Sequence, residues 1–353
     1  MPRLSPFLQR YYPKARLARC TKLRVAGFLP VLLVIGLQGL AYFTAVPGTL
    51  IPLYSKFPIL SVACLILFHF IFVNVVINYF LLVFLDPGSP PEEWHAPPPP
   101  TIARMHPRKT DEDEANILLH TQPQEAFQYA HLIKERTYDG LLRYCRFCSA
   151  YKPDRSHHCS ACRRCILRMD HHCVFVNNCI SFYNHKFFIG FVTYAFLGCV
   201  QVALVSFPTF IGIISLSAST VSNFRTDHLV TVVRALISVR LSLKSFSVAD
   251  QLSEPVKTIT MIGYITTSAF SFALSVFVAM HFYLTAKGRT TIEMYEITDP
   301  ARMPFVMQYD LGIANNFKSV CGSRPLYWFF PTRSYIEGDG LSYQRRSDIE
   351  SAV

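Results

Sequence analysis

The chain has 353 residues, of which 51% are hydrophobic and only 16% are charged, whereas ordinary soluble domains carry roughly 25% charged residues. This composition excludes an intrinsically disordered chain, because it supplies ample apolar surface to bury. Eleven cysteines spread over 353 residues are too sparse for a small secreted domain held together by disulfides. The net charge of +11 suits nucleic acid, anionic lipid or a polyanionic cofactor.

The apolar residues fall in four blocks, each longer than the roughly 18–20 residues that carry a helix across a bilayer. Helices of soluble proteins rarely run that long without a polar face. We therefore predict an all-α integral membrane protein with four transmembrane helices, with approximate bounds Val25–Val46, Phe57–Leu85, Phe187–Leu216 and Ile259–Leu284.

The charges around these blocks predict the topology. Seven Lys and Arg side chains and no acidic residue precede Val25, so the positive-inside rule places this tail in the cytosol. Four crossings then put the C-terminus and the segment Ser89–Lys186 in the cytosol as well. The apolar run His228–Leu243 is expected to be an interfacial helix, because its two arginines count against a fifth span. The expected location is an endomembrane such as Golgi or ER, or the vacuole or plasma membrane.

A proline-rich stretch follows the second predicted span. Asp86-Pro87-Gly88 and the prolines up to Pro100 indicate a stiff, extended spacer. The acidic run Asp111–Glu114 is read as solvated surface, and Ala115–Arg136 as a helix. The expected domains are a basic tail (1–24), helices 1 and 2 (25–86), a linker (87–144), a cysteine-rich domain (145–186), helices 3 and 4 with a lumenal loop (187–284) and a cytosolic C-terminal region (285–353).

Seven of the eleven cysteines fall between Cys145 and Cys179. Repeated Cys-x2-Cys pairs with nearby histidines are typical of zinc sites, and a cytosolic segment keeps its thiols reduced. Two structural Zn²⁺ ions need eight ligands, which six cysteines and two histidines can supply if one cysteine is withheld. The alternative is that all seven cysteines and one histidine bind metal, which would leave no free thiol for chemistry.

The run from Cys145 to Phe188 resembles the cysteine-rich domain of the DHHC family of protein S-acyltransferases. The resemblance rests on the tetrad Asp170-His171-His172-Cys173 within its zinc frame, and it extends to weaker motifs near Asp86, Thr291, Glu293 and Asn316. It implies four membrane spans with a two-zinc cytosolic domain between helices 2 and 3. The implied zinc ligands are Cys145, Cys148, His158 and Cys165 for one ion, and Cys159, Cys162, His171 and Cys179 for the other.

This ligand set leaves Cys173, His172 and Asp170 for chemistry. A thiol is the simplest nucleophile for the thioester of an acyl-CoA, but it must lose its proton first. We expect His172 to take that proton and Asp170 to orient the imidazole. The predicted enzyme moves a palmitoyl-type chain from acyl-CoA to cysteine thiols of membrane-proximal proteins, without a nucleic-acid partner.

Contacts with acyl-CoA are expected from Lys152, Arg155 and Arg168 through the CoA phosphates, and from Phe175 and Gly198 through the acyl chain. The chain departs from the family pattern at Val174 and Phe175, where the family usually has Pro and Trp. That departure keeps an alternative open, a membrane-anchored zinc-binding interaction or scaffold protein. Such a protein would be an inactive family member or a ubiquitin-ligase-like module, although the ligand spacing does not follow that of a RING domain.

Overall fold

The computed structural model describes residues 27–95, 127–138, 140–221, 245–300, 302–332 and 338–350. The predicted basic tail over 1–24, the acidic run Asp111–Glu114 and the interfacial helix His228–Leu243 lie outside these residues. The predicted helix over Ala115–Arg136 is wrong where it can be checked. Residues 127–136 hold the 3-10 turn η5 (Ala130–Leu132) and Arg136, which forms an antiparallel bridge with Leu142, but no α-helix. Burial of Ile133 and Glu135 overrides local helix preference here.

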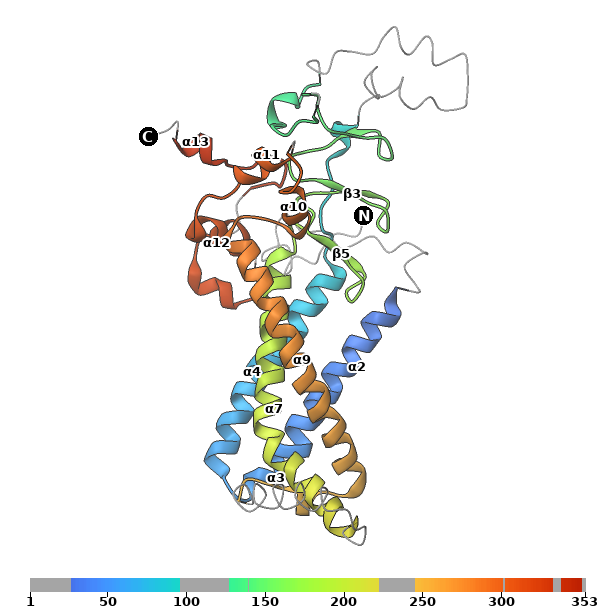
Figure 1. The fold of residues 1–353 in the computed structure, drawn as a ribbon, viewed down its shortest axis with the longest axis vertical. Helices are drawn as coiled ribbons and strands as arrows, with labels where there is room; N and C mark the ends of the chain where they lie inside the picture. The colour runs from blue at the N-terminus through green and yellow to red at the C-terminus, as the bar shows by residue number, and fades with distance from the viewer. Residues whose placement is uncertain are drawn as a thin grey trace, which may run out of the picture. The chain divides into compact units, whose positions relative to one another are not determined.

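Within the described residues, four helices are long and apolar enough to cross a membrane, which confirms the predicted number. They span Phe28–Tyr54, Pro58–Phe84, His185–Leu216 and Glu254–Ala286 (Figure 1). The first combines α2 (Phe28–Ala45), the π-helix η2 (Val46–Leu50) and α3 (Ile51–Tyr54). The others belong to α4 (Pro58–Phe84), α7 (His185–Val221) and α9 (Glu254–Ala286).

The chain divides into two compact units. The helical unit comprises Phe28–Asn78 and Ile189–Met280. The cysteine-rich unit comprises Gly27 together with the described residues of Tyr79–Phe188 and of the segment from His281 to the C-terminus.

The helical unit packs through small residues, ring contacts and a few polar bonds. Gly263 on α9 lies so close to Thr44 on α2 that a Cβ atom would collide with it. The rings of Phe210 and Tyr264 stack with centroids 4.1 Å apart. Many large apolar side chains of this unit point outward instead, among them Ile59, Ile66, Leu204 and Phe272. An apolar exterior of this kind suits lipid and not water.

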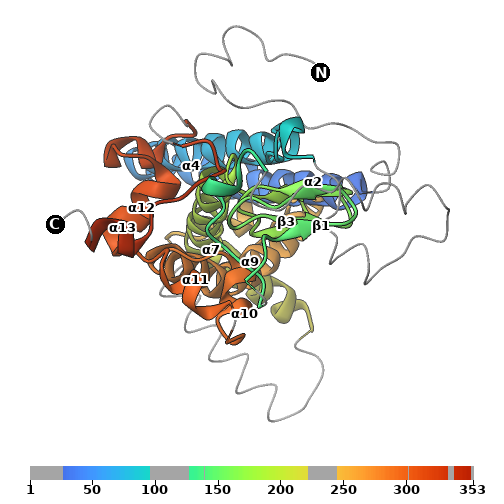
Figure 2. The same cartoon turned by 90° about the horizontal axis from the view of Figure 1, so that it is seen from above.

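Three β-hairpins form the centre of the cysteine-rich unit and follow one another along the chain (Figures 1 and 2). All three are antiparallel. Their strands are β1 (Tyr144–Cys145) with β2 (Ala150–Tyr151), β3 (His157–Cys159) with β4 (Arg164–Ile166), and β5 (His171–Cys173) with β6 (Asn178–Ile180). The turn residues Ser149, Arg163 and Asn177 all have positive φ, so the three hairpins share one turn geometry.

The C-terminal part of the chain packs on these hairpins through short helices and buried charges. Glu135 is central to this contact, because it accepts hydrogen bonds from the backbone of Arg155 and from Tyr309, and it pairs with Arg143 and Arg302. The helical elements of this C-terminal part are α10 (Thr291–Glu296), α11 (Met303–Met307), α12 (Ile313–Cys321), η7 (Pro325–Phe329) and α13 (Arg346–Glu350). The 3-10 turn η3 (Glu92–Trp94) precedes the hairpins in the chain.

Candidate active site and metal centres

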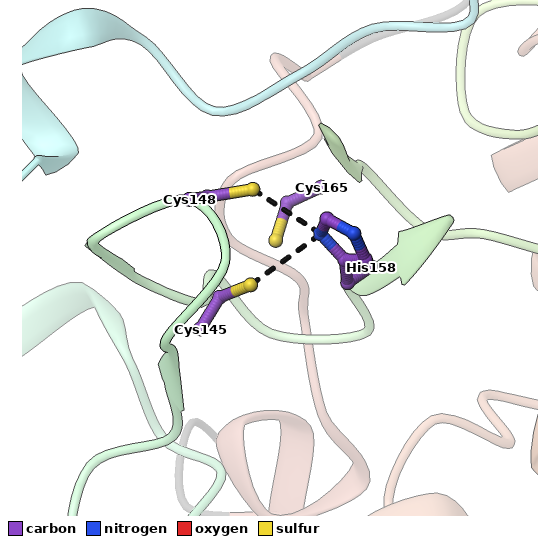
Figure 3. A group of neighbouring side chains, drawn as sticks. All are labelled: Cys145, Cys148, His158 and Cys165. Carbon is purple, nitrogen blue, oxygen red and sulfur yellow. Dashed lines mark hydrogen bonds between the residues drawn. The ribbon is translucent and has the colours of Figure 1, made fainter. Parts of the chain in front are cut away.

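The first group of metal-binding side chains contains the four residues expected for one ion. Cys145, Cys148, His158 and Cys165 converge on a common centre (Figure 3). The His158 Nδ1 atom lies 3.5 Å from the Cys145 sulfur and 3.2 Å from the Cys148 sulfur. The β3–β4 register sets His158 directly opposite Cys165, so one hairpin supplies both ligands.

The second group contains Cys159, Cys162, His172 and Cys179. The His172 Nδ1 atom lies 3.6 Å from the sulfurs of Cys159 and Cys162, and 3.5 Å from that of Cys179. The expectation that His171 joins this group is therefore wrong. His172 occupies the ligand position.

Both groups fit tetrahedral zinc. Zinc bonds of about 2.3 Å to sulfur and 2.0–2.1 Å to nitrogen, at tetrahedral angles, separate the two atoms by about 3.6 Å. The sulfur–nitrogen separations of 3.2–3.6 Å are close to that value. Three thiolates and one imidazole are also a common ligand set for a structural zinc ion. The two groups could thus hold two zinc ions.

The alternation of side chains along a β-strand explains the exchange of the two histidines. Neighbouring residues of a strand point to opposite faces, and directly paired residues of two strands share a face. His172 is paired with Cys179, so its ring is directed to the metal group. His171 and Cys173 are two residues apart and share the other face.

A sequence signal for this arrangement was available but was missed. Adding 14 to each residue number of the first group gives the second group, because both follow the pattern Cys-x2-Cys-x9-His-x6-Cys. The pattern selects His172 over His171 without any structural information.

His171 lies between a carboxylate and a thiol. Its Nδ1 donates a hydrogen bond to Asp170 Oδ2 over 2.6 Å, and the ring also hydrogen-bonds with the Cys173 side chain. Burial alone would lower the pKa of His171, but these hydrogen bonds outweigh burial and raise that pKa to about 9. Cys173 belongs to neither thiol group. The three side chains thus have the order of a nucleophile, a base and an orienting acid.

Asp170 is 1% exposed and is held by two donors from one residue of α10. The Thr291 amide donates to Oδ1 over 2.7 Å, and the Thr291 hydroxyl donates to Oδ2 over 2.9 Å. Burial would raise the pKa of this carboxyl, but the bonds from His171 and Thr291 and the nearby imidazoles keep it below its usual range. Asp170 therefore stays charged and directs the His171 ring.

The other motif residues also have defined contacts. Glu293 forms two 2.6 Å bonds with the Arg155 guanidinium, and its side chain completes a capping box with Thr290 at the start of α10. Asp86 pairs with Arg164 at 3.0 Å. Asn316 donates to the carbonyl of Ala286 over 2.8 Å, which ties α12 to the end of α9.

Two buried histidines that the sequence reasoning did not assign to the site also lie beside Asp170. His185 and His281 each offer a nitrogen within 4.8 Å of the Asp170 carboxylate and of each other. The His281 ring contacts Phe188 edge-on, with centroids 4.8 Å apart. No periodicity in the sequence relates these residues to the tetrad.

The residues expected to contact acyl-CoA differ in their accessibility. Arg155 and Arg168 are buried, and Arg155 is committed to Glu293, so neither position favours contact with a phosphate. Lys152 is partly exposed, and Phe175 is 53% exposed beside Cys173. Gly198 lies in the helical unit, where a Cβ atom would come within 3.3 Å of Ile71.

Comparisons with known proteins show the family to which the chain belongs. Residues 139–298 match the model of the DHHC palmitoyltransferase family. The chain is 31% identical to the probable protein S-acyltransferase 14 of Arabidopsis thaliana, over 94% of this chain and 95% of that protein. It is also 31% identical to palmitoyltransferase ZDHHC20 of Homo sapiens, over 93% of this chain and 79% of that protein. The chain belongs to the DHHC family of protein S-acyltransferases.

Proposed function

We propose that the chain transfers a long-chain acyl group, such as palmitoyl, from acyl-CoA to cysteine thiols of proteins, with Cys173 as the nucleophile. One observation carries this proposal. Cys173 lies outside both thiol groups and hydrogen-bonds with His171, which Asp170 holds at 2.6 Å. His171 takes the role of base that the sequence reasoning gave to His172.

The first step loads the enzyme. The proton of Cys173 passes to His171, a transfer that the raised pKa of this ring favours, and the sulfur then attacks the thioester carbonyl of acyl-CoA. Asp170 occupies Nδ1 of that ring, which leaves Nε2 for the proton. The bond between the acyl carbon and the CoA sulfur then breaks, and CoA leaves as a thiol with the proton returned by His171.

The second step delivers the acyl group. A substrate thiol gives its proton to His171 and attacks the acyl carbon, the bond to Cys173 breaks, and Cys173 recovers the proton. One thioester replaces another at each step, so the transfer requires neither ATP nor a redox reaction. The two zinc ions would be structural, held by the two groups described above, and would fix the hairpins that carry the reacting residues.

The membrane explains why a four-span protein carries this chemistry. Extracting a fatty chain from lipid costs about 0.8 kcal/mol per methylene, so the nucleophile is best placed at the bilayer surface. Val174 and Phe175 follow Cys173 and are 56% and 53% exposed, which makes them suitable contacts for an acyl chain or lipid. The basic N-terminal tail supports a cytosolic position for the cysteine-rich unit and for both termini, in an endomembrane or the plasma membrane.

The test is self-acylation and transfer by the purified enzyme, using acyl-CoA with a clickable fatty chain and a cysteine-containing peptide. The wild type should form a hydroxylamine-sensitive adduct and pass its label to the peptide. Cys173→Ser should lose both activities and keep its zinc. Cys321→Ser, which changes a buried cysteine outside both groups, should retain both activities. Hydroxylamine-sensitive label on Cys173→Ser would contradict the proposed nucleophile.

A further inference from the structure

An exposed apolar segment lies near the C-terminus, distant in sequence from the catalytic tetrad. We define this aromatic segment as Pro325–Phe330, which includes η7. Leu326 is 71% exposed, Phe329 62% and Phe330 47%. Three large apolar side chains exposed within five residues are costly in water and mark an interaction surface.

The aromatic segment is firmly attached to the ends of two membrane-spanning helices. Lys186, in the first turn of α7, donates to the carbonyls of Tyr327 and Thr332 over 2.8 and 2.5 Å. On the other side, the Trp328 ring stacks on Phe317 of α12, and Phe317 contacts Phe282 near the end of α9. Figure 1 shows α12 beside this end of α9.

The chemistry of the segment matches the boundary of a bilayer. Tyr and Trp are enriched at membrane interfaces, where their rings are apolar and their polar atoms reach hydrogen-bonding partners. Here the Trp328 Nε1 donates to the Gly322 carbonyl over 2.8 Å, so its polar atom is already satisfied. The exposed cations Lys318 and Arg324 precede the segment in the chain and can face lipid phosphates.

We propose that the aromatic segment inserts into the lipid interface beside the ends of α7 and α9, as an anchor additional to the four spans. Lipid is favoured over a protein partner because the segment contacts the start of α7 directly and the end of α9 through Phe317, and both helices have apolar, membrane-spanning composition. Insertion would fix the height of this part of the cysteine-rich unit above the bilayer. The inference does not depend on acyl transfer.

Tryptophan fluorescence tests this anchor directly, because the chain has only two tryptophans, Trp94 and Trp328. The full-length protein is placed in nanodiscs of phosphatidylcholine with bromine either near the carbonyl end or near the methyl end of the acyl chains. Trp94 is 1% exposed and packs on Tyr129, so it should not be quenched. The emission assigned to Trp328, as the difference between wild type and Trp328→Phe, should be quenched most by the shallow bromines.

Two variants separate the anchor from general effects of added charge. Leu326→Asp with Phe329→Asp should lose the quenching of Trp328 and shift its emission to longer wavelength. Tyr138→Asp places one such negative charge at an 88% exposed position outside the segment and should leave the quenching unchanged. Cys173→Ser should also retain it, which distinguishes this inference from the proposed function. Equal Trp328 emission in brominated and ordinary lipid, whether the segment faces water or a protein, would overturn the anchor.

Discussion

The second and third hairpins carry the same three-residue sequence with different consequences. Strand β3 reads His157-His158-Cys159, and strand β5 reads His171-His172-Cys173. In each strand the central histidine joins a thiol group with the cysteine paired opposite it. The difference lies in the residues on either side of that central histidine.

In the second hairpin the flanking cysteine, Cys159, belongs to the second metal-binding group, together with Cys162, His172 and Cys179. In the third hairpin Cys173 stands at the same repeat position, but Val176 occupies the place where Cys148 and Cys162 stand in the earlier turns. No third group captures Cys173 among the described residues. The proposed nucleophile, Cys173, is thus the first cysteine of a metal-binding repeat that lacks its second cysteine.

The flanking histidines differ because of the residue that precedes them. Ser156 precedes His157 and donates its hydroxyl to the Pro153 carbonyl, and the His157 ring lies 3.8 Å from the acid Glu296. Asp170 precedes His171 and binds it at 2.6 Å. A carboxylate in place of a hydroxyl, together with a missing ligand, distinguishes the hairpin that we propose to be catalytic from the one that only contributes metal-binding side chains.

The largest effect is expected when Asp170 is replaced by serine, the residue that stands at the equivalent position, 156, of the second hairpin. Asp170→Ser removes the group that orients His171, so self-acylation should slow by about 10²–10⁴-fold. Zinc content should stay at two ions per chain, since Asp170 is in neither thiol group. The measurement is single-turnover loading from acyl-CoA together with elemental analysis. Loading at the wild-type rate would show that the two hairpins do not differ through Asp170.

A smaller effect is expected from the residue that holds Asp170. Thr291→Val keeps the amide bond to Asp170 but removes the 2.9 Å hydroxyl bond, and a hydrogen bond to a charged group contributes about 1.5–3 kcal/mol. Loading should therefore slow by about 10- to 150-fold. Thr291→Ser retains the hydroxyl and should restore most of the rate. Equal loss in both variants would indicate a packing role for Thr291 instead.

The smallest expected effect is on the preferred length of the acyl chain, and it comes from a residue outside the hairpins. Gly198 is 11 residues beyond Phe187, which places it about 17 Å further along the helix. Gly198→Tyr should shift preference toward shorter acyl-CoA by about 10-fold or less, while leaving loading with a short chain unchanged. Rates are compared across a panel of acyl-CoAs, and an unchanged profile removes Gly198 from the acyl site.

Much of the architecture could be predicted because it depends on strong local signals. Four apolar blocks, each long enough to cross a bilayer as a helix, predicted the membrane-spanning helices. Closely spaced cysteines predicted the metal-binding segment. The boundaries were less certain, since α7 begins at His185 and α9 at Glu254, where polar residues start the helix. Terminal turns of this kind are not encoded in hydrophobicity alone.

The roles of His171 and His172 were exchanged because two adjacent histidines offer the same chemistry. Only the alternation of side chains along the strand, or the 14-residue offset between the two metal-binding groups, distinguishes the metal-binding histidine from its neighbour. The burial of Arg155 depends on Glu293, which lies 138 residues away in the sequence. His185 and His281 reach Asp170 only through the tertiary fold, so no sequence pattern marked them.

The most direct test of the account is the zinc content and loading rate of His171→Ala and His172→Ala, measured side by side on purified protein. We predict that His171→Ala keeps two zinc ions and loads about 10²–10⁴-fold more slowly. His172→Ala should lose one ion and unfold at lower temperature, because structural zinc contributes on the order of 10 kcal/mol to folding. Loss of zinc from His171→Ala, with two ions retained in His172→Ala, would contradict the division of roles along β5.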